Sequence, residues 1–257
     1  MTKDLRVSRD GPVLTVTFDR PAQHNAMTFA MYDDLHAACE TADSDPEVRV
    51  MVLRGAGGRA FVSGTDIAGF RDFRVGADGV AYEERIASVV NRLEDVTVPT
   101  VAAVEGYCLG GGLALAAVCD LRVATASARF GVPIARTLGN CLSMNSVSVL
   151  VAQLGPARAL DMLLRATMLD ANEAHAAGFV AQVCDDTALD ATLEDVIATL
   201  LSHAPLTMWA SKQAVTRLRR AGVPDGDDLV ARTFGSQDFR SAVASFGSGN
   251  RATWEGM

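Results

Sequence analysis

The sequence predicts an α/β fold that ends in a block of amphipathic helices. Two short segments, Val48–Leu53 and Thr100–Val104, are apolar without alternation, which is typical of parallel strands covered on both faces. The second segment leads to the glycine triplet Gly110–Gly112, which opens an Ala/Leu-rich stretch of helical character. From Leu189 onward the periodicity is helical. The 257 residues, 49% of them hydrophobic, suffice for one large domain with a full core.

Strand and helix signals alternate in the first hundred residues. The Asp10-Gly11 turn signal between two short runs predicts a hairpin. Gly69–Gly79 mixes charge with glycine, so we expect a loop there. The expected elements are strands at Leu5–Arg9, Val13–Phe18 and Val48–Leu53, and helices at Thr28–Ala42 and Val80–Val96.

The second half continues with a strand and then mainly helices. Gly155 closes one helix, and Pro156 suits the first position of the next. The expected elements are strands at Leu121–Ala124 and Phe179–Cys184, and helices at Ser143–Leu154, Glu173–Ala177, Leu189–His203, Leu206–Ala221 and Asp227–Phe246.

Composition excludes several classes of protein. The net charge of −8 argues against a nucleic-acid partner, because a phosphate backbone requires clustered basic residues. The five cysteines are scattered, odd in number and without metal-ligand spacing, which argues against a disulfide framework and a zinc site. No apolar run reaches the roughly 20 residues of a membrane span. We therefore expect a soluble, cytoplasmic protein that holds no metal and binds no membrane.

The glycine triplet predicts a place where a ligand approaches the backbone. Glycines lack a Cβ, and the first N–H groups of a helix have no partner within the helix. The helix dipole adds partial positive charge at the same point, so an anion or a developing oxyanion is favoured there. The alternative is a tight crossover from strand to helix, in which glycine serves only close packing.

Two nucleotide-binding interpretations fail. A P-loop is excluded because no Gly-Lys-Ser/Thr follows the triplet, and the chain has only two lysines, Lys3 and Lys212. The segment Gly55–Ala60 formally fits the GxGxxA variant of the dinucleotide fingerprint. That fingerprint requires a helix to open at once, yet Phe61–Gly64 has no helical periodicity. An oxyanion site for a less charged ligand remains.

Several segments resemble, in order, motifs of the crotonase (enoyl-CoA hydratase/isomerase) family. The signature-like stretch VAAVEGYCLGGGLALAAVCDLRVAT contains the triplet, and RAFVSGTDI is similar to the family's first oxyanion loop. RPAQHNAM, RFGVP, LGPARALDMLL and DANEAHAAGFV also match. The resemblance implies a crotonase-like spiral of ββα units in residues 1–190 and a C-terminal helical trimerisation region in residues 191–257. It also implies a homotrimer or a dimer of trimers.

The same resemblance implies a site for an acyl-CoA thioester. The backbone N–H groups of Thr65 and Gly111 match the two donors of the family's oxyanion hole, which stabilise negative charge on the thioester oxygen. CoA enters as part of the substrate, so no separate cofactor is expected. The positions that match CoA-binding and substrate-binding residues are Gln23, His24, Ala26, Arg59, Ser63, Gly64, Asp66, Ile67, Tyr107 and Gly110.

The chain departs from the family at the CoA phosphates. The family often has a lysine directly after the Asp-Ile pair of the first oxyanion loop, where this chain has Ala68. Arg59, Arg71 or Arg251 is a candidate substitute.

A second departure concerns the chemistry. Hydratases of this family carry one glutamate two residues after the triplet and another after the FGxP motif, where this chain has Ala114 and the stretch Ile134–Arg136. No acidic residue occurs between Asp120 and Asp161. Addition of water requires proton transfer at both carbons of the double bond, so simple hydratase activity is doubtful.

Other candidates for the acid or base are few. Glu83 and Glu84 lie at the start of a predicted helix that borders the acyl pocket in the family, although such a charge pair favours a solvated helix face. Glu105 precedes Tyr107 in the signature loop, where a structural role is favoured. Cys141 as a nucleophile lacks a nearby histidine in the sequence.

Three functions are compatible with these residues. The first is an acyl-CoA enzyme with chemistry other than simple hydration, such as isomerisation, hydrolysis or decarboxylation. The second is a hydratase whose acid and base come from elsewhere, for instance from Glu83 or Glu84. The third is a catalytically silent acyl-CoA-binding protein.

Overall fold

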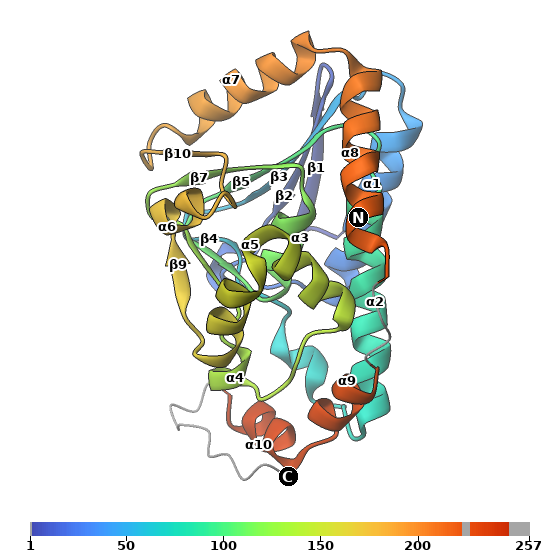
Figure 1. Ribbon diagram of the computed structural model, residues 1–257, viewed down its shortest axis with the longest axis vertical. Helices are drawn as coiled ribbons and strands as arrows, with labels where there is room; N and C mark the ends of the chain where they lie inside the picture. Colours follow the sequence, from blue (N-terminus) through green and yellow to red (C-terminus); the bar gives the residue numbers. More distant parts are fainter. Residues whose placement is uncertain (1, 223–226, 247–257) are drawn as a thin grey trace.

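The computed structural model describes residues 2–222 and 227–246, whose strands form two sheets (Figure 1). The larger sheet has the order β1-β2-β3-β5-β7-β10, and the smaller has the order β4-β6-β8-β9. Neighbouring strands are parallel except in the pairs β1–β2 and β8–β9. The strands are β1 (Leu5–Asp10), β2 (Val13–Phe18), β3 (Val50–Gly55), β4 (Ala60–Val62), β5 (Thr100–Val104), β6 (Tyr107–Leu109), β7 (Leu121–Thr125), β8 (Arg129–Gly131), β9 (Met168–Asp170) and β10 (Gln182–Cys184).

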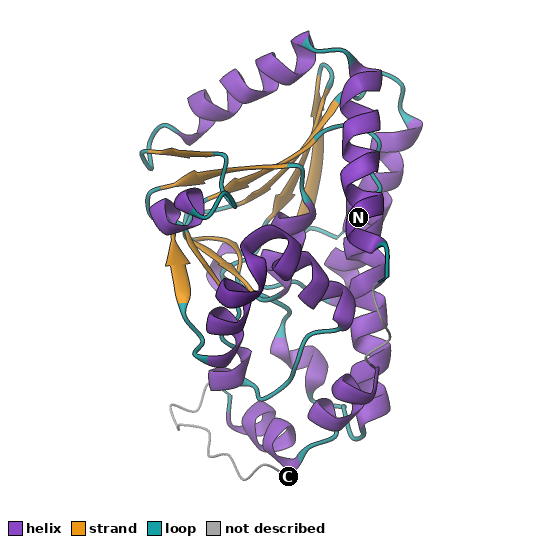
Figure 2. Ribbon diagram, in the orientation of Figure 1, coloured by secondary structure: helices purple, strands orange, loops and turns teal. Residues whose placement is uncertain are grey.

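Helices surround the two sheets (Figure 2). Three times in succession a strand of the larger sheet is followed by a strand of the smaller sheet and then by a helix, which confirms the spiral of ββα units. The helices are α1 (Phe29–Ser44), α2 (Gly76–Glu94), α3 (Gly111–Val118), α4 (Ile134–Thr137), α5 (Met144–Leu164), α6 (Ala171–Ala176), α7 (Leu189–Ser202), α8 (Pro205–Arg220), α9 (Asp227–Phe234) and α10 (Gln237–Ser245), with short 3₁₀ helices η1 (Pro21–Gln23) and η2 (Ile67–Phe70). The division at residue 190 stays a prediction.

Strand β3 in the larger sheet has apolar residues on both faces, and both faces are buried. Met51 and Leu53 of β3 point into the main core, together with side chains of α1 and α2. Their neighbours Val50 and Val52 lie in a second cluster, which contains Leu193 of α7. Successive strand residues point to opposite faces, so a strand covered on both faces shows no polar alternation.

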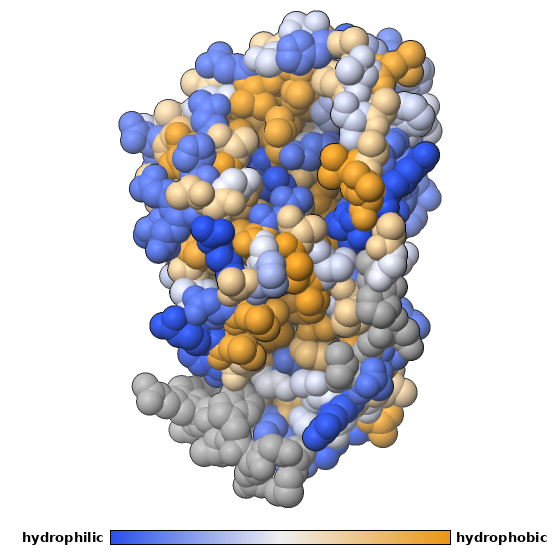
Figure 3. All heavy atoms as spheres, in the orientation of Figure 1, coloured by the Kyte–Doolittle hydropathy of each residue, from blue (hydrophilic) through white to orange (hydrophobic). Residues whose placement is uncertain are grey.

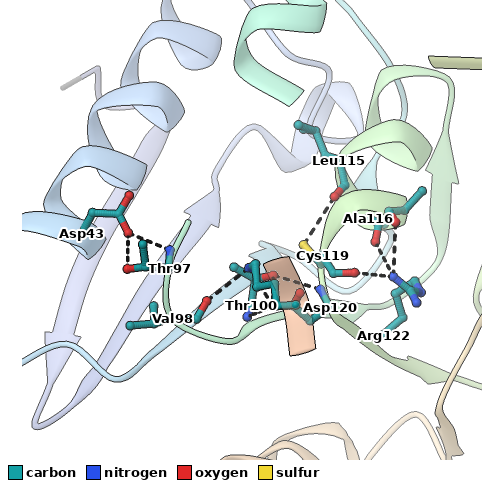
Figure 4. A network of polar contacts seen from close by, with 11 residues as sticks. Asp43, Thr97, Val98, Thr100, Leu115, Ala116, Cys119, Asp120 and Arg122 are labelled. Carbon is teal, nitrogen blue, oxygen red and sulfur yellow. Dashed lines mark hydrogen bonds and ion pairs between the residues drawn. The ribbon is translucent and has the colours of Figure 1, made fainter. Parts of the chain in front are cut away.

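Polar contacts fix the junction between β5, α3 and β7 (Figure 4). Asp120 Oδ2 accepts the main-chain N–H of Thr100 at 2.7 Å and the ammonium of Lys212 at 2.8 Å. The buried Arg122 guanidinium donates to the carbonyl oxygen of Cys119 at 2.5 Å, directly after α3. These contacts anchor the C-terminal end of the helix that begins at the glycine triplet.

Two expectations about the loops and helices were wrong. The expected loop Gly69–Gly79 is largely ordered structure, because α2 already begins at Gly76. A Cβ on Gly76 would lie 2.0 Å from the carbonyl oxygen of Ala231 in α9, so this glycine permits close helix packing. The single helix expected over Asp227–Phe246 is two helices, because Ser236 caps a new helix by accepting the N–H of Phe239 at 3.0 Å.

Helix α5 changes direction in its middle. Gly155 has φ 76° and ψ 158°, which no helix contains, and Pro156 opens the second half. This confirms the predicted break. Among the described helices, α5 alone is long and apolar enough to cross a membrane by length and composition. This is weak evidence, because core helices pass the same test.

Candidate active site

The backbone of Thr65 is fixed from both sides. Its neighbours pair with Met27, since the N–H of Met27 donates to the carbonyl of Gly64 at 2.9 Å and the N–H of Asp66 donates to the carbonyl of Met27 at 2.8 Å. The Thr65 hydroxyl lies between two tyrosine hydroxyls, at 2.9 Å from Tyr32 Oη and 2.7 Å from Tyr82 Oη. The Thr65 N–H donates no hydrogen bond to another of the described residues.

Gly111 begins α3 beside this threonine. As the first residue of the helix, it has an N–H without a partner inside the helix. A Cβ on Gly111 would lie 2.6 Å from Tyr32 Oη and 3.9 Å from the main-chain nitrogen of Thr65. The space beside the two amides therefore has no room for a side chain at position 111. The preceding Gly110 has φ 51° and ψ −118°, a conformation that favours glycine.

A cavity of about 240 Å³ opens beside the two amides. Its walls come from the loop after β4, from η2 and α2, from the start of α3, and from α4 and the loop after it. The lining residues include Ser63, Gly64, Thr65, Ile67, Gly110 and Gly111, which the sequence predicted. They also include Asn140, whose loop the sequence marked as possible pocket lining, and Ile134, at the position that matches the second hydratase glutamate. Thr137, Leu138 and Leu142 were not assigned to the site.

Glu83 is the carboxyl group in the lining of this cavity. Its side chain belongs to α2 and is only 5% exposed. Burial raises the pKa of Glu83 to about 7, although hydrogen bonds from Ser143 oppose the rise. One of these is donated by the main-chain N–H of Ser143 to Glu83 Oε2 at 2.8 Å. The expectation of a solvated face was therefore wrong for Glu83, while Glu84 is exposed.

No acidic side chain stands at the two positions that the resemblance matches to the hydratase glutamates. Ala114 is 7% exposed and packs in the main core, while Ile134 lines the cavity. Arg136, at the end of α4, is exposed. Asn140 lines the cavity, and its Oδ1 is buried without a hydrogen-bond partner among the described residues. Glu83 and Asn140 are therefore among the polar residues that line the cavity.

The remaining acid and nucleophile candidates lie outside the lining. Glu105 is half-buried after β5, and burial raises its pKa while the charge of Arg54 opposes the rise. Burial also raises the pKa of the Cys141 thiol, which disfavours the thiolate that a nucleophile requires. Neither side chain lines the cavity.

The predicted CoA-side residues form a cluster next to Ser63. The N–H of Ser63 donates to the carbonyl of His24 at 3.1 Å, and the His24 ring lies 2.9 Å from Arg59 Nη2 and in edge contact with Tyr107. None of His24, Arg59 and Tyr107 lines the cavity itself, and the same holds for Gln23, Ala26 and Asp66.

Two of the neighbouring residues hold loops in place through hydrogen bonds. Asp66 accepts Arg20 Nη1 at 2.9 Å and the N–H of Ala68 at 3.1 Å, which ties η2 to the loop after β2. Asn25, which sequence reasoning missed, is fully buried and donates through Nδ2 to the carbonyls of Ala56 and Ala60 at 3.0 and 2.7 Å.

Comparison with known proteins shows the family to which the chain is similar. The family model described as "Enoyl-CoA hydratase/isomerase" matches residues 8–256. The chain belongs to this family. The enoyl-CoA hydratase/isomerase family acts on acyl-CoA thioesters, and the resemblance seen in the motifs is thereby confirmed.

Individual relatives extend over nearly the whole chain. The chain is 29% identical over 244 residues to the short-chain-enoyl-CoA hydratase of Clostridium acetobutylicum, with 93% of both chains covered. It is 31% identical over 248 residues to the 2,3-dehydroadipyl-CoA hydratase of Escherichia coli, with 95% of both covered. The crystal structure of an enoyl-CoA hydratase/carnithine racemase from Magnetospirillum magneticum is similar with a TM-score of 0.82 and 31% identity, covering 100% of this chain and 97% of that one.

Proposed function

We propose that this member of the enoyl-CoA hydratase/isomerase family moves a carbon–carbon double bond within an enoyl-CoA thioester. The amides of Thr65 and Gly111 form the oxyanion hole, and Glu83 carries the proton. One observation supports this assignment above the others: a buried carboxyl with a pKa of about 7 lines the same cavity as the two amides.

The reaction is a proton shift between two carbons. The Glu83 carboxylate removes a proton from the carbon next to the thioester carbonyl of a 3-enoyl-CoA. The electron pair moves into the conjugated system, and negative charge appears on the thioester oxygen, where the two N–H groups stabilise it. Loss of one such donor typically costs roughly 10²–10³ in rate. The protonated Glu83 then gives its proton to carbon 4 of the acyl group, at the far end of the original double bond. The product is the conjugated 2-enoyl-CoA.

A single carboxyl suits isomerisation better than hydration. A proton shift needs one group that first accepts and then donates the same proton. Hydration must both activate a water molecule and protonate a carbon, which the family's hydratases accomplish with two glutamates. Glu83 is the one carboxylate among the described residues that line the cavity, so the arrangement supports the first of the three functions.

The direct experiment incubates the purified protein with a 3-enoyl-CoA and follows its conversion to the 2-enoyl isomer. We expect the absorbance of the conjugated thioester to appear while the product mass stays that of the substrate. Glu83→Gln keeps the shape of the side chain and should lower turnover by roughly 10²–10⁴-fold. Glu84→Gln is the matched control, because Glu84 is its exposed neighbour. Equal loss in both variants, or no loss in Glu83→Gln, would contradict the role of Glu83.

Hydration is the second candidate. Its specific support is the buried Asn140 Oδ1, which has no partner among the described residues and is placed to accept a hydrogen bond from a water molecule in the cavity. Relatives that are named hydratases favour it as well. A product heavier by one water, formed at an enzymatic rate from a 2-enoyl-CoA, would decide for hydration. Tight binding of thioesters without any turnover would instead indicate the silent acyl-CoA-binding protein.

We also propose that CoA lies at the Ser63 end of the cavity. Two positively charged or ionisable side chains, Arg59 and His24, lie beside Ser63 and are positioned to meet the CoA phosphates. Arg59→Gln should weaken binding of free CoA and of every acyl-CoA by the same factor, measured by titration calorimetry.

Association of copies of the chain is supported by an apolar face. Figure 3 shows hydrophobic residues gathered on the face that carries α5 and α8. Large hydrophobic side chains that are exposed on these two helices are Val151, Leu160, Leu164, Leu206, Trp209, Val215 and Leu218. We expect this face to be covered in a homotrimer or a dimer of trimers. Light scattering of Leu164→Asp should then show smaller particles than the unchanged chain.

A further inference from the structure

A second cavity adjoins the cavity beside the Thr65 and Gly111 amides, which we call the acyl cavity. It has a volume of about 390 Å³ and lies between η2, the loop after it, and α10. Phe70 and Phe246 line both cavities, so the two spaces meet at these rings. Phe73 and Phe239 extend the apolar wall, with ring centroids 6.4 Å apart. An acyl group that extends from the Thr65 and Gly111 amides past Phe70 would therefore reach the second cavity.

Three arginines line this second cavity: Arg71, Arg74 and Arg240. Arg71 and Arg74 are exposed and Arg240 is half-buried, so these charges keep contact with solvent while they line the cavity. The chain as a whole carries a net charge of −8, so the cluster is a local exception.

Arg240 and Arg74 donate hydrogen bonds to neutral oxygens. Arg240 donates to Gln237 Oε1 at 3.1 Å and to the main-chain carbonyl of Gly235 at 2.9 Å. Arg74 donates to the main-chain carbonyl of Arg71 at 2.6 Å. Within the described part of the chain, the Arg71 side chain has no hydrogen-bond or ion-pair partner.

Carboxylates near the cluster do little to neutralise it. Arg74 Nη2 lies 3.9 Å from Asp72, whose side chain is fully exposed, and such exposed pairs contribute little. The Asp78 carboxylate faces the same segment, but it accepts the main-chain N–H groups of Arg74 and Val75 at 2.6 and 2.9 Å. The cluster therefore retains donors for an incoming anion.

We propose that the acyl group of the natural substrate ends in a carboxylate, which binds to the cluster of Arg71, Arg74 and Arg240. This inference rests on the proposed function, since it takes the thioester carbonyl to be held by the Thr65 and Gly111 amides. The apolar walls at Phe70 and Phe73 suit the methylene segment between the two ends. Planar guanidinium forks suit a carboxylate better than a neutral methyl end.

The CoA phosphates are the other anion that the cluster could attract. They are less suited, because the Ser63 end of the acyl cavity already has Arg59, which lies beside His24. The arginine cluster instead adjoins the cavity at Phe70 and Phe246. The two ends of the site therefore carry separate arginines, Arg59 at one end and the cluster at the other.

The test measures binding of unreactive saturated thioesters, so that it does not depend on turnover. Titration calorimetry compares hexanoyl-CoA with adipoyl-CoA, octanoyl-CoA with suberoyl-CoA, and both pairs with free CoA. In at least one pair we expect the carboxylated thioester to bind roughly tenfold or more tightly, as for a charge-assisted hydrogen bond in a partly buried site. Arg71→Gln, which loses no described partner, and Arg240→Gln should each reduce this preference. Arg232→Gln on α9, an exposed arginine outside both cavities, is the control for loss of one positive charge.

Each outcome decides a separate question. Equal affinity for the two members of every pair would overturn the proposal. So would a loss in Arg71→Gln and Arg240→Gln that is the same for free CoA as for the carboxylated thioesters, because the cluster would then bind CoA phosphates. Failure of the proposed function is distinguishable from both results, since in that case no acyl-CoA would bind more tightly than free CoA, or Glu83→Gln would retain full turnover.

Discussion

The main-chain nitrogen of Thr65 lies 3.9 Å from the point that a Cβ would occupy on Gly111. Two residues 46 positions apart in the chain thus bring their backbones together at one end of the cavity, one from the loop after β4 and one from the first turn of α3. The glycine is required here because any larger residue would enter this space.

Alanine at position 111 tests this requirement. In Gly111→Ala the new methyl group would meet Tyr32 Oη at 2.6 Å, so we expect lower stability together with a loss of turnover of roughly 10²-fold or more. The double variant Gly111→Ala/Tyr32→Phe removes the clashing hydroxyl and should recover thermal stability, while turnover stays low because the methyl still stands beside the Thr65 amide. Tyr32→Phe alone is the control. Full turnover in the double variant would show that the space is not used.

The Thr65 hydroxyl should matter because it bridges Tyr32 and Tyr82 in the protein interior. Thr65→Val deprives both tyrosine hydroxyls of this partner, and each unsatisfied buried group costs about 1–3 kcal/mol. Thr65→Ser retains the hydroxyl and should restore most of the stability. Urea unfolding of the two variants measures the difference. Equal stability of Thr65→Val and Thr65→Ser would mean that this bridge does not hold the loop.

The pH dependence of turnover should report the carboxyl of Glu83. Burial raises its pKa to about 7, and the proposed reaction begins from the carboxylate. Below that pH, kcat/KM of the isomerisation should therefore fall about tenfold per pH unit, and above it the rate should level off. The Glu84→Gln control should keep this profile. A profile that is flat between pH 5 and 8 would exclude Glu83 as the base.

The same shift of pKa predicts how stability changes with pH. The carboxyl binds its proton more tightly in the folded state than in the unfolded chain, where the pKa is near 4.5. Its contribution to stability is therefore fully present below about pH 4.5 and is lost as the pH rises through about 7, a change of about 3 kcal/mol. Glu83→Gln cannot ionise, so its melting temperature relative to the unchanged chain should rise between pH 5 and pH 8. A constant difference would contradict a buried, shifted Glu83.

Much of the fold could be predicted from local sequence patterns. The bounds of Val13–Phe18 and Thr100–Val104 agree with the structure, because these strands end at turn residues and their apolar faces are buried. The break at Gly155 and the start of α3 at the triplet were visible for a similar reason, since glycine marks backbone conformations that other residues avoid. The helix start at Gly76 could not be predicted locally, because this glycine packs against α9, which is distant in sequence.

The candidate site was predictable only where backbone motifs determine it. Thr65 and Gly111 lie in recognisable loops, whereas Glu83 resembled an ordinary surface acid at a helix start. One signal could have corrected this: Glu83 lies three residues before Ile86 and seven before Val90, on the stripe that α2 buries. Asn140 stood out in the sequence only as part of a polar cluster with Cys141 and Ser143, and of these three residues Asn140 alone lines the cavity, because the loop has no periodic pattern that fixes where each side chain points.

The central claim is that the amides of Thr65 and Gly111 polarise one thioester carbonyl, and it can be measured on the bound ligand. Isotope-edited difference infrared spectroscopy of an acyl-CoA labelled with ¹³C at the thioester carbonyl reports the strength of that C=O bond. We expect the stretching frequency to drop on binding below its value in water, and the drop to disappear in Gly111→Pro, which lacks the N–H. A carbonyl frequency in the complex equal to that in water would contradict the proposed oxyanion hole.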